Sequence, residues 1–375
     1  MHRSWIASFI VILTLVACAS PTGAPPPSGG AAAQVSEWDQ TVAAAKAEGK
    51  VVVIGGSGDE IRDALTIEFR KKYPEIEIEF SGMPGSQVPP KIGGEFTSGR
   101  ALTDIVIAGT TTVIEAFVPP GYVDPVRKYI TGPSSKEESS WRGGKYLFAD
   151  DSQQYCMVGV AYAKAPFLYG SDFVQASEFK SYNDLLDPKW KGKIAFFDPR
   201  RAGGGLANVT FWYATPALGK DYIQKFFATQ DVTISGDSSQ LINWAARGEK
   251  PIAIGVGDLE SVEAIRKGIP VKQIPGDTFS EGGYITSGNG AISVMRDPPH
   301  PNATKVYMDW LLSREGSYAW SKGAGFASMR ADVPSDHVYD YLVPKPGVDY
   351  QDNYAEKYVK MRPDIIAYLE TILPR

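Results

Sequence analysis

Residues 184–205 read DLLDPKWKGKIAFFDPRRAGGG and combine three signals of an α/β fold in one run. Asp187-Pro188 and Gly192 are typical of a turn, because proline presets φ and glycine tolerates a positive φ. Residues 194–197 are an apolar run with the length of a buried strand. A loop with two arginines and three glycines follows and leads into an expected helix. Open α/β sheets bind ligands at such strand ends, although many glycine-rich loops are only tight turns.

The same alternation of strand, loop and helix precedes and follows this stretch. Residues 51–54, 76–80 and 104–108 have the patterns of strands, and an expected helix follows each of them. This order predicts a mainly parallel sheet with helices on both faces. A second set of strands and helices extends over about residues 164–273, and residues 154–163 are expected to be a strand between the two sets. We therefore expect two lobes whose strand-end loops face each other across a cleft.

Three loops of the first set are candidates for holding a ligand. Residues 55–58, 82–86 and 109–112 are expected along one edge of the sheet, where they offer backbone N–H groups, small hydroxyls and helix N-termini. These groups together suit an anion or a polar head group. The alternative is that the glycines and threonines only cap helices. The candidate ligand residues on these loops are Gly56, Ser57, Gly58, Ser86, Thr110 and Thr111.

The N-terminal residues predict export and anchoring. A basic start precedes an apolar run over residues 5–16, which is shorter than the roughly 20 residues that span a bilayer and is typical of a secretory signal. The small residues before Cys18 look like a bacterial lipobox, in which this cysteine is lipidated. We expect residues 1–17 to be a signal peptide and residues 18–36, rich in Pro, Gly, Ala and Ser, to be a flexible tether. The protein would then act on the outer face of the cytoplasmic membrane, in the periplasm or at the cell surface.

Composition argues against several classes of function. The formal net charge of −5 disfavours a nucleic-acid partner. Cys156 stands alone in an apolar run, so we expect a buried and unreactive thiol rather than a disulfide framework. Beyond the signal peptide the histidines are His300 and His337, and no zinc, nucleophile-elbow or phosphate-loop motif accompanies them. We therefore expect no catalytic residues, no metal and no cofactor.

Two long segments resemble a known family. Residues 184–195, DLLDPKWKGKIA, are similar to the W-x-D-L-x-D-P-x-W-K-G-K-I segment of the extracellular solute-binding proteins of ABC importers, in the ferric-iron, thiamine, polyamine and phosphonate group. Residues 292–303 and 309–316 look like a late segment of the same family. The resemblance covers nearly all of the exported chain. It implies a monomeric receptor with a type II periplasmic-binding-protein fold, whose two lobes close about a hinge on a small solute and deliver it to permease subunits.

The resemblance also implies a division of the chain. The first lobe would comprise residues 37–152 and 285–375, and the second lobe residues 153–284. The candidate ligand residues on the second lobe and on the wall of the cleft are Tyr155, Arg200, Arg201, Gly204, Asp258 and Tyr284.

The sequence is compatible with more than one class of solute. Ferric members of the family bind metal through adjacent tyrosines, but the corresponding position here reads Gly257-Asp258-Leu259-Glu260. Arg200 and Arg201 favour a carboxylate or phosphonate, which arginine binds through two hydrogen bonds, and Asp258 or Glu260 would suit an amine. Alternatively, these charges form salt bridges or face solvent, and the two tyrosines belong to the core. A ferric receptor with another ligand set, and a sensor or enzyme on the same scaffold, remain the other hypotheses.

Overall fold

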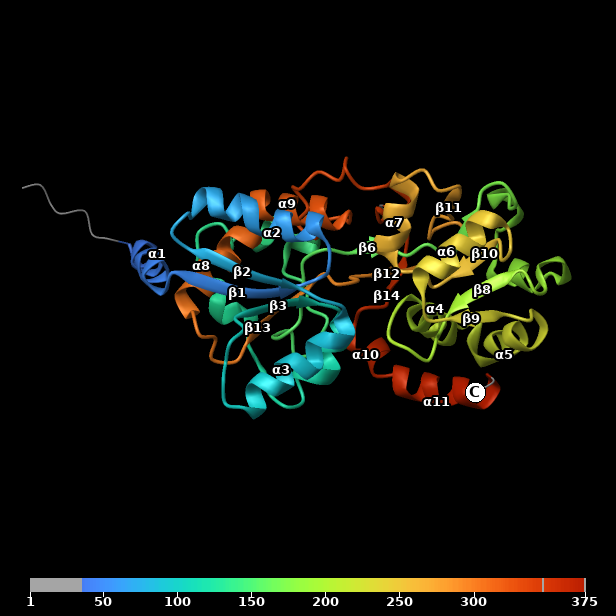
Figure 1. Cartoon of the computed structure of the whole chain (residues 1–375), viewed down its shortest axis with the longest axis horizontal. Coiled ribbons are helices and arrows are strands. Elements are labelled where there is room, and N and C mark those ends of the chain that lie inside the picture. The colour runs from blue at the N-terminus through green and yellow to red at the C-terminus, as the bar shows by residue number, and fades with distance from the viewer. Residues whose placement is uncertain (1–35, 346, 374–375) are drawn as a thin grey trace, which may run out of the picture. The chain divides into compact units, whose positions relative to one another are not determined.

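The computed structural model describes residues 36–345 and 347–373. Residues 37–375 form one compact unit, and the predicted signal peptide, Cys18 and nearly all of the tether lie outside the described residues. Figure 1 shows two sheets with helices around each of them. We call the sheet around β1 with its helices the first lobe, and the sheet around β8 with its helices the second lobe.

The first lobe is built on a mixed sheet with the strand order β2-β1-β3-β13-β4. Strands β2, β1 and β3 run parallel, whereas β13 runs antiparallel to β3 and also pairs with β5. The parallel strands form because runs such as Val51-Val52-Val53-Ile54 are buried completely or nearly so. The strands are β1 (Lys50–Gly55), β2 (Glu77–Gly82), β3 (Ile105–Ala108), β4 (Val123–Asp124), β5 (Met157–Val158) and β13 (Ala291–Met295).

Helices of this lobe bury apolar stripes on the sheet. Ile61, Leu65 and Phe69 recur at intervals of four residues on α2 and are at most 9% exposed, as an amphipathic helix requires. Helix α2 packs against α9, and α1 packs against α8. The helices are α1 (Glu37–Glu48), α2 (Asp59–Lys72), α3 (Val88–Thr97), α8 (Pro301–Leu311) and α9 (Arg314–Ala324), and a π-helical segment (Thr112–Phe117) follows β3.

The second lobe has its own sheet, with the order β11-β7-β10-β8-β9. Strands β9, β8 and β10 are parallel, and β7 is antiparallel to both β10 and β11. The strands are β7 (Leu168–Gly170), β8 (Ile194–Phe197), β9 (Thr233–Ser235), β10 (Ile252–Ile254) and β11 (Val271–Gln273). The helices are α4 (Gly204–Ala214), α5 (Gly219–Thr229), α6 (Ser238–Arg247) and α7 (Asp258–Arg266).

A small third sheet lies on the connections between the lobes. Strand β12 (Gly283–Thr286) pairs with β6 (Tyr162–Ala163) and with β14 (Tyr350–Asp352). The chain then forms α10 (Glu356–Val359) and α11 (Arg362–Ile372). Short 3-10 turns occur at Gly85–Gln87, Val126–Tyr129, Glu138–Ser140, Arg142–Gly144, Ala176–Glu178, Tyr182–Leu186, Pro188–Trp190 and Asp340–Leu342.

The predicted α/β fold with helices flanking two sheets is confirmed, with local differences. The strand expected over residues 154–163 is divided into β5 and β6, because β5 pairs with β13 of the first sheet and β6 pairs with β12 of the third sheet. The helix expected after the glycine-rich loop begins within that loop, at Gly204, and ends at Ala214, since Pro216 disfavours helical geometry in the residue before it. Helix α11 packs into the core of the second lobe, although the expected division assigned residues 285–375 to the first lobe.

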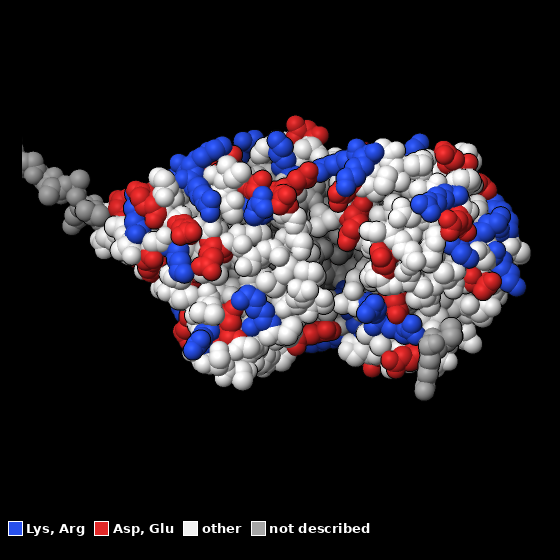
Figure 2. All heavy atoms as spheres, viewed as in Figure 1, with Lys and Arg blue, Asp and Glu red and all other residues white. Residues whose placement is uncertain are grey.

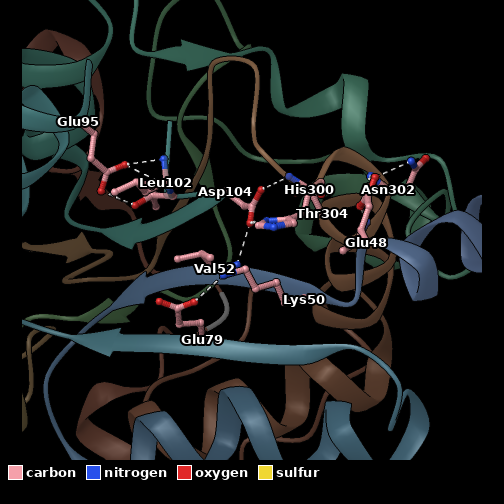
Figure 3. A network of polar contacts seen from close by, with 12 residues as sticks. Glu48, Lys50, Val52, Glu79, Glu95, Leu102, Asp104, His300, Asn302 and Thr304 are labelled. Carbon is pink, nitrogen blue, oxygen red and sulfur yellow. Dashed lines mark hydrogen bonds and ion pairs between the residues drawn. The ribbon is translucent and has the colours of Figure 1, made fainter. Parts of the chain in front are cut away.

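A polar network holds the first lobe together at the ends of its strands opposite the expected ligand loops. Figure 3 shows Asp104 directed at Val52 on β1 and at His300 before α8. Asp104 is fully buried and accepts hydrogen bonds from the Val52 and His300 N–H groups, each at 2.8 Å. The His300 ring Nδ1 lies 2.8 Å from the same carboxyl group. Glu48 similarly accepts the first N–H groups of α8. His300 thus has a structural role in joining α8 to the sheet.

Candidate functional site

Loops at the carboxyl ends of the first-lobe strands meet around one asparagine. The Asn289 side chain lies 3.6 to 4.0 Å from the Cβ positions that side chains at Gly56, Gly85 and Gly109 would occupy. These glycines follow β1, β2 and β3, and Asn289 precedes β13, whose antiparallel pairing with β3 brings its start to the same edge. Asn289 is exposed, and its amide offers both a donor and acceptors. The three loops predicted from the sequence therefore converge, and Asn289 joins them.

Three helices begin at strand ends without a side-chain cap. The N-cap residues of α2, α4 and α7 are Gly58, Gly203 and Gly257, and none of them makes a side-chain capping bond. In contrast, Asp237 and Ser313 cap α6 and α9 through their side chains. An uncapped N-terminus leaves backbone N–H groups available to water or to a ligand. Ser57 and Gly58 before α2 are exposed, as a binding loop requires.

The loop after β3 differs in exposure from the other two. Thr110 is 5% exposed and Thr111 is partly buried, whereas Ser86 after β2 is exposed. The π-helical segment that follows Thr111 is a type of helix often found at functional sites. The threonine hydroxyls therefore lie deeper than the serines of the neighbouring loops.

Asp258, expected to bind an amine of the ligand, already has a protein amine as its partner. Its carboxylate forms an ion pair with the ammonium group of Lys164 and accepts a 2.6 Å hydrogen bond from the Tyr162 hydroxyl. The side chains of Lys164 and Asp258 are 5% and 12% exposed. Lys164 also donates to the Val256 carbonyl at 3.0 Å, which holds the N-terminus of α7 against β6. Burial, together with the charge of Asp258, raises the pKa of Tyr162 well above its ordinary value.

Arg200 and Arg201 lie in the loop between β8 and α4, and Gly204 is the first residue of α4. Arg200 is held by Asp198 through hydrogen bonds of 2.9 and 3.1 Å and lines a surface hollow of about 450 Å³ shared with Ile372 and Leu373. Arg201 is exposed beside Gly236. Gly204 packs closely on the second sheet, because a Cβ there would lie 2.5 Å from the Gly255 carbonyl oxygen. These contacts give all three residues a local structural explanation.

The two candidate tyrosines have different surroundings. Tyr284 is fully buried and stacks on Phe211 of α4, with ring centroids 5.2 Å apart. Its hydroxyl has no hydrogen-bond partner among the described residues. Tyr155 is partly buried against the first-lobe core, and its carbonyl accepts a 2.8 Å hydrogen bond from Ser293 in the middle of β13. Tyr284 thus belongs to the second-lobe core near the connections, and Tyr155 lies against the first sheet.

Figure 2 shows a hollow between the two lobes on the viewed face, with acidic and basic side chains on both sides of it. Polar contacts join the two lobes and also tie the connections to the second lobe. Arg266 on α7 forms a 2.7 Å ion pair with Glu60 on α2, and Asn353 donates a 2.9 Å hydrogen bond to the Ala207 carbonyl on α4.

In residues 36–345 and 347–373, no cluster of three His, Cys, Asp or Glu side chains suits a metal ion. No helix in this part of the chain has the length and apolar character needed to cross a membrane.

Comparison with known families decides the class of protein. Residues 64–342 match the family described as bacterial extracellular solute-binding proteins. The chain belongs to this family. An uncharacterised protein of Haemophilus influenzae is 24% identical to this solute-binding protein over 302 residues, which cover 74% of this chain and 78% of that protein.

Solved structures of periplasmic binding proteins share the fold. The periplasmic binding protein P5PA is 20% identical with a TM-score of 0.61, covering 87% of this chain and 100% of its own. AfuA from Actinobacillus pleuropneumoniae, with fructose-6-phosphate bound, is 18% identical with a TM-score of 0.64, covering 86% and 98%. IdiA (FutA) from Trichodesmium, in complex with iron and citrate, is 17% identical with a TM-score of 0.63, covering 86% and 99%. These likenesses confirm the type II periplasmic-binding-protein fold.

The sequence did not indicate several residues of the candidate site in this solute-binding protein. Asn289 lies in a turn-like segment before β13, and only the antiparallel pairing of β13 with β3 brings it to the candidate ligand loops. Lys164 gave no signal because its partner Asp258 is 94 residues away. Arg362, at the start of α11, is 9% exposed and donates a hydrogen bond to the Thr111 hydroxyl. A lone arginine before Pro363 carries no recognisable sequence pattern.

Proposed function

We propose that this protein is the solute-binding component of an ABC importer, and that it captures a small organic anion without chemical conversion. The observation that carries this proposal is the convergence of the β1, β2 and β3 loops around Asn289, beside the uncapped N-terminus of α2. Exposed N–H groups, hydroxyls and an amide at the positive end of a helix favour an anion. The permease subunits would then receive the solute from this site.

Relatives of the same fold support an anionic solute. AfuA binds fructose-6-phosphate, and the Trichodesmium protein binds iron together with citrate. Both organic ligands carry anionic oxygens. The zwitterionic alternative has less support, because the Asp258 carboxylate is already paired with Lys164. A ferric receptor with a non-standard ligand set remains the second candidate, since the Trichodesmium relative combines iron with an organic anion.

We also propose how the protein is placed and how it moves. The lipobox-like Cys18 and the tether of residues 18–36 would anchor a monomeric body to the outer face of the cytoplasmic membrane. The two lobes would be formed mainly by residues 37–152 with 285–375 and by residues 153–284, with α11 attached to the second lobe. Rotation about the connecting strands would close the lobes, and the ligand would stabilise the closed state relative to the open state.

Native mass spectrometry of the purified chain, followed by calorimetric titration, tests the proposal. We expect a small organic anion to be retained, or bound from solution when citrate, fructose-6-phosphate or a phosphonate is added, without turnover. Asn289→Ala should weaken that binding by about tenfold, the effect of one hydrogen bond. Thr41→Ala on α1, whose hydroxyl bonds within its own helix, should not change it. Binding of ferric ion alone, with a visible tyrosinate-to-iron absorption, would contradict the anion proposal. Consumption of the ligand would contradict the transport role.

A further inference from the structure

Arg362 is a buried cation, and no acidic side chain of the described residues is in direct contact with it. The residue is 9% exposed, and its guanidinium donates to the Thr111 hydroxyl and, at 3.3 Å, to the Asn353 carbonyl. The Nε–H group has no hydrogen-bond partner among the described residues. Glu115 acts on the guanidinium electrostatically but forms no ion pair with it in the described structure. Among the described residues, Arg362 therefore has a charge that no contacting carboxylate balances and one N–H donor without an acceptor.

Such an arrangement is unfavourable unless another group completes it. A buried charge is costly unless it is paired and hydrogen-bonded, and the two acceptors of Arg362 are a neutral hydroxyl and a neutral carbonyl. Burial lowers the pKa of Arg362 from its ordinary value, yet arginine still remains charged in proteins. Arg200 shows the contrast, because the carboxylate of Asp198 neutralises it locally.

The position of Arg362 joins the candidate site to the second lobe. Thr111 belongs to the loop after β3, one of the three loops that converge in the first lobe. Arg362 begins α11, whose Ile365 and Leu369 are buried in the second-lobe core. Asn353, which accepts from Arg362, binds the Ala207 carbonyl of α4. The Tyr284 hydroxyl is a second buried polar group that has no hydrogen-bond partner among the described residues. The contacts of Arg362 with Thr111 and Asn353 thus place its guanidinium between the first-lobe loop and the connections to the second lobe.

We infer that Arg362 is the residue that recognises the anionic group of the solute, and that this group forms an ion pair with the guanidinium beside Thr111. The ligand class is an organic molecule bearing a carboxylate or a phosphate, both of which match the planar fork of arginine. This inference rests on the proposed function. It places the charge-recognising residue at the start of the last helix, about 15 Å along that helix from Ile372 and the hollow that Arg200 lines.

Binding and stability of the full chain test this role together. The probes are fructose-6-phosphate, citrate and inorganic phosphate, with fructose as the uncharged comparison, added to wild type, Arg362→Lys, Arg362→Met and Arg247→Met. Arg247 is an exposed arginine at the end of α6 and serves as the matched control. We expect Arg362→Met to lower the affinity for the bound anion about 30-fold or more and to abolish the rise in melting temperature that the anion causes in wild type. Arg362→Lys should retain part of both effects, and Arg247→Met all of them.

The outcomes separate the two proposals. If wild type binds an anion and Arg362→Met binds it equally well, the role of Arg362 is overturned while the proposed function stands. Loss of thermal stability in Arg362→Met and Arg362→Lys with unchanged anion affinity would likewise mean that Arg362 only holds α11 in place. If wild type binds none of the anions and retains none after purification, the proposed function fails, and the inference fails with it. Response to inorganic phosphate alone would identify the phosphate group, rather than the organic part, as what Arg362 recognises.

Discussion

At the scale of single residues, the role of a buried polar side chain depends on partners that are far away in the chain. Asp104 binds His300 before α8, 196 residues further along the chain, and Asp258 on α7 binds Lys164 after β6, 94 residues earlier in the chain. Burial raises the pKa of Asp104, against the opposing effect of the hydrogen bonds from Val52 and His300. Both acids thus have structural explanations that their local sequence does not reveal.

The first prediction concerns Asp104. Asp104→Ala removes the acceptor for two backbone N–H groups, those of Val52 and His300. An unsatisfied buried group costs about 1–3 kcal/mol, so we expect the free energy of unfolding to fall by about 2–4 kcal/mol. Urea titration monitored by tryptophan fluorescence measures this change. Asp172→Ala, at an exposed turn, is the control and should leave the midpoint unchanged. An equal effect of the two substitutions would contradict the role assigned to Asp104.

At the scale of elements, glycines that look alike in sequence do different things. Gly203 takes a positive φ of 142°, and Gly205 lies directly against the carbonyl of Phe197, so α4 starts in close contact with β8. The sequence predicts the glycine-rich loop as a ligand cradle, but these contacts explain it as packing of a helix on a sheet. By contrast, Gly94 in the middle of α3 faces open space, because no neighbouring atom lies within 4 Å of the position that a Cβ would take.

The second prediction compares these glycines. Gly205→Ala forces its methyl group onto the Phe197 carbonyl, and we expect a loss of about 1–3 kcal/mol in stability, as for other overpacked sites. Gly94→Ala adds a good helix former in open space and should gain about 0.5–1 kcal/mol. Thermal unfolding of the two variants should therefore shift in opposite directions. A stable, unchanged Gly205→Ala protein would mean that the α4 N-terminus does not pack as described.

At the scale of the whole molecule, the chain forms a separate hydrophobic core in each lobe, and its later helices pack against both cores. The first core joins Val51, Phe69 and Trp310, whereas the second joins Phe196, Trp212 and Tyr284. The C-terminal helix contributes Ile365 and Leu369 to the second core. More than fifty residues before this helix belong to the first lobe and to the connections. The last helix therefore fastens the end of the chain to the second lobe and positions Arg362 between the lobes.

The third prediction tests this attachment. Leu369→Ala removes a fully buried side chain from the second core, and Leu→Ala substitutions in cores cost about 2–5 kcal/mol. We expect hydrogen exchange, followed by mass spectrometry, to become faster in β8 and β10 than in β1 and β13. Leu311→Ala, equally buried in the first core, should produce the reverse pattern. Identical patterns for the two variants would show that the lobes unfold as one unit.

The local amino-acid sequence by itself determined most helices and strands of this solute-binding protein. Periodicity and turn residues were sufficient for the parallel strands, for most helices and for the loops at their ends, because these depend on neighbours within a few positions. Tertiary structure alone decided which loops meet. The antiparallel return of β13 brings Asn289 to the candidate ligand loops, the pairing with Lys164 accounts for Asp258, and the docking of α11 brings Arg362 to Thr111. A charge or an amide acquires its role from groups that are close in space, and those groups are distant in sequence.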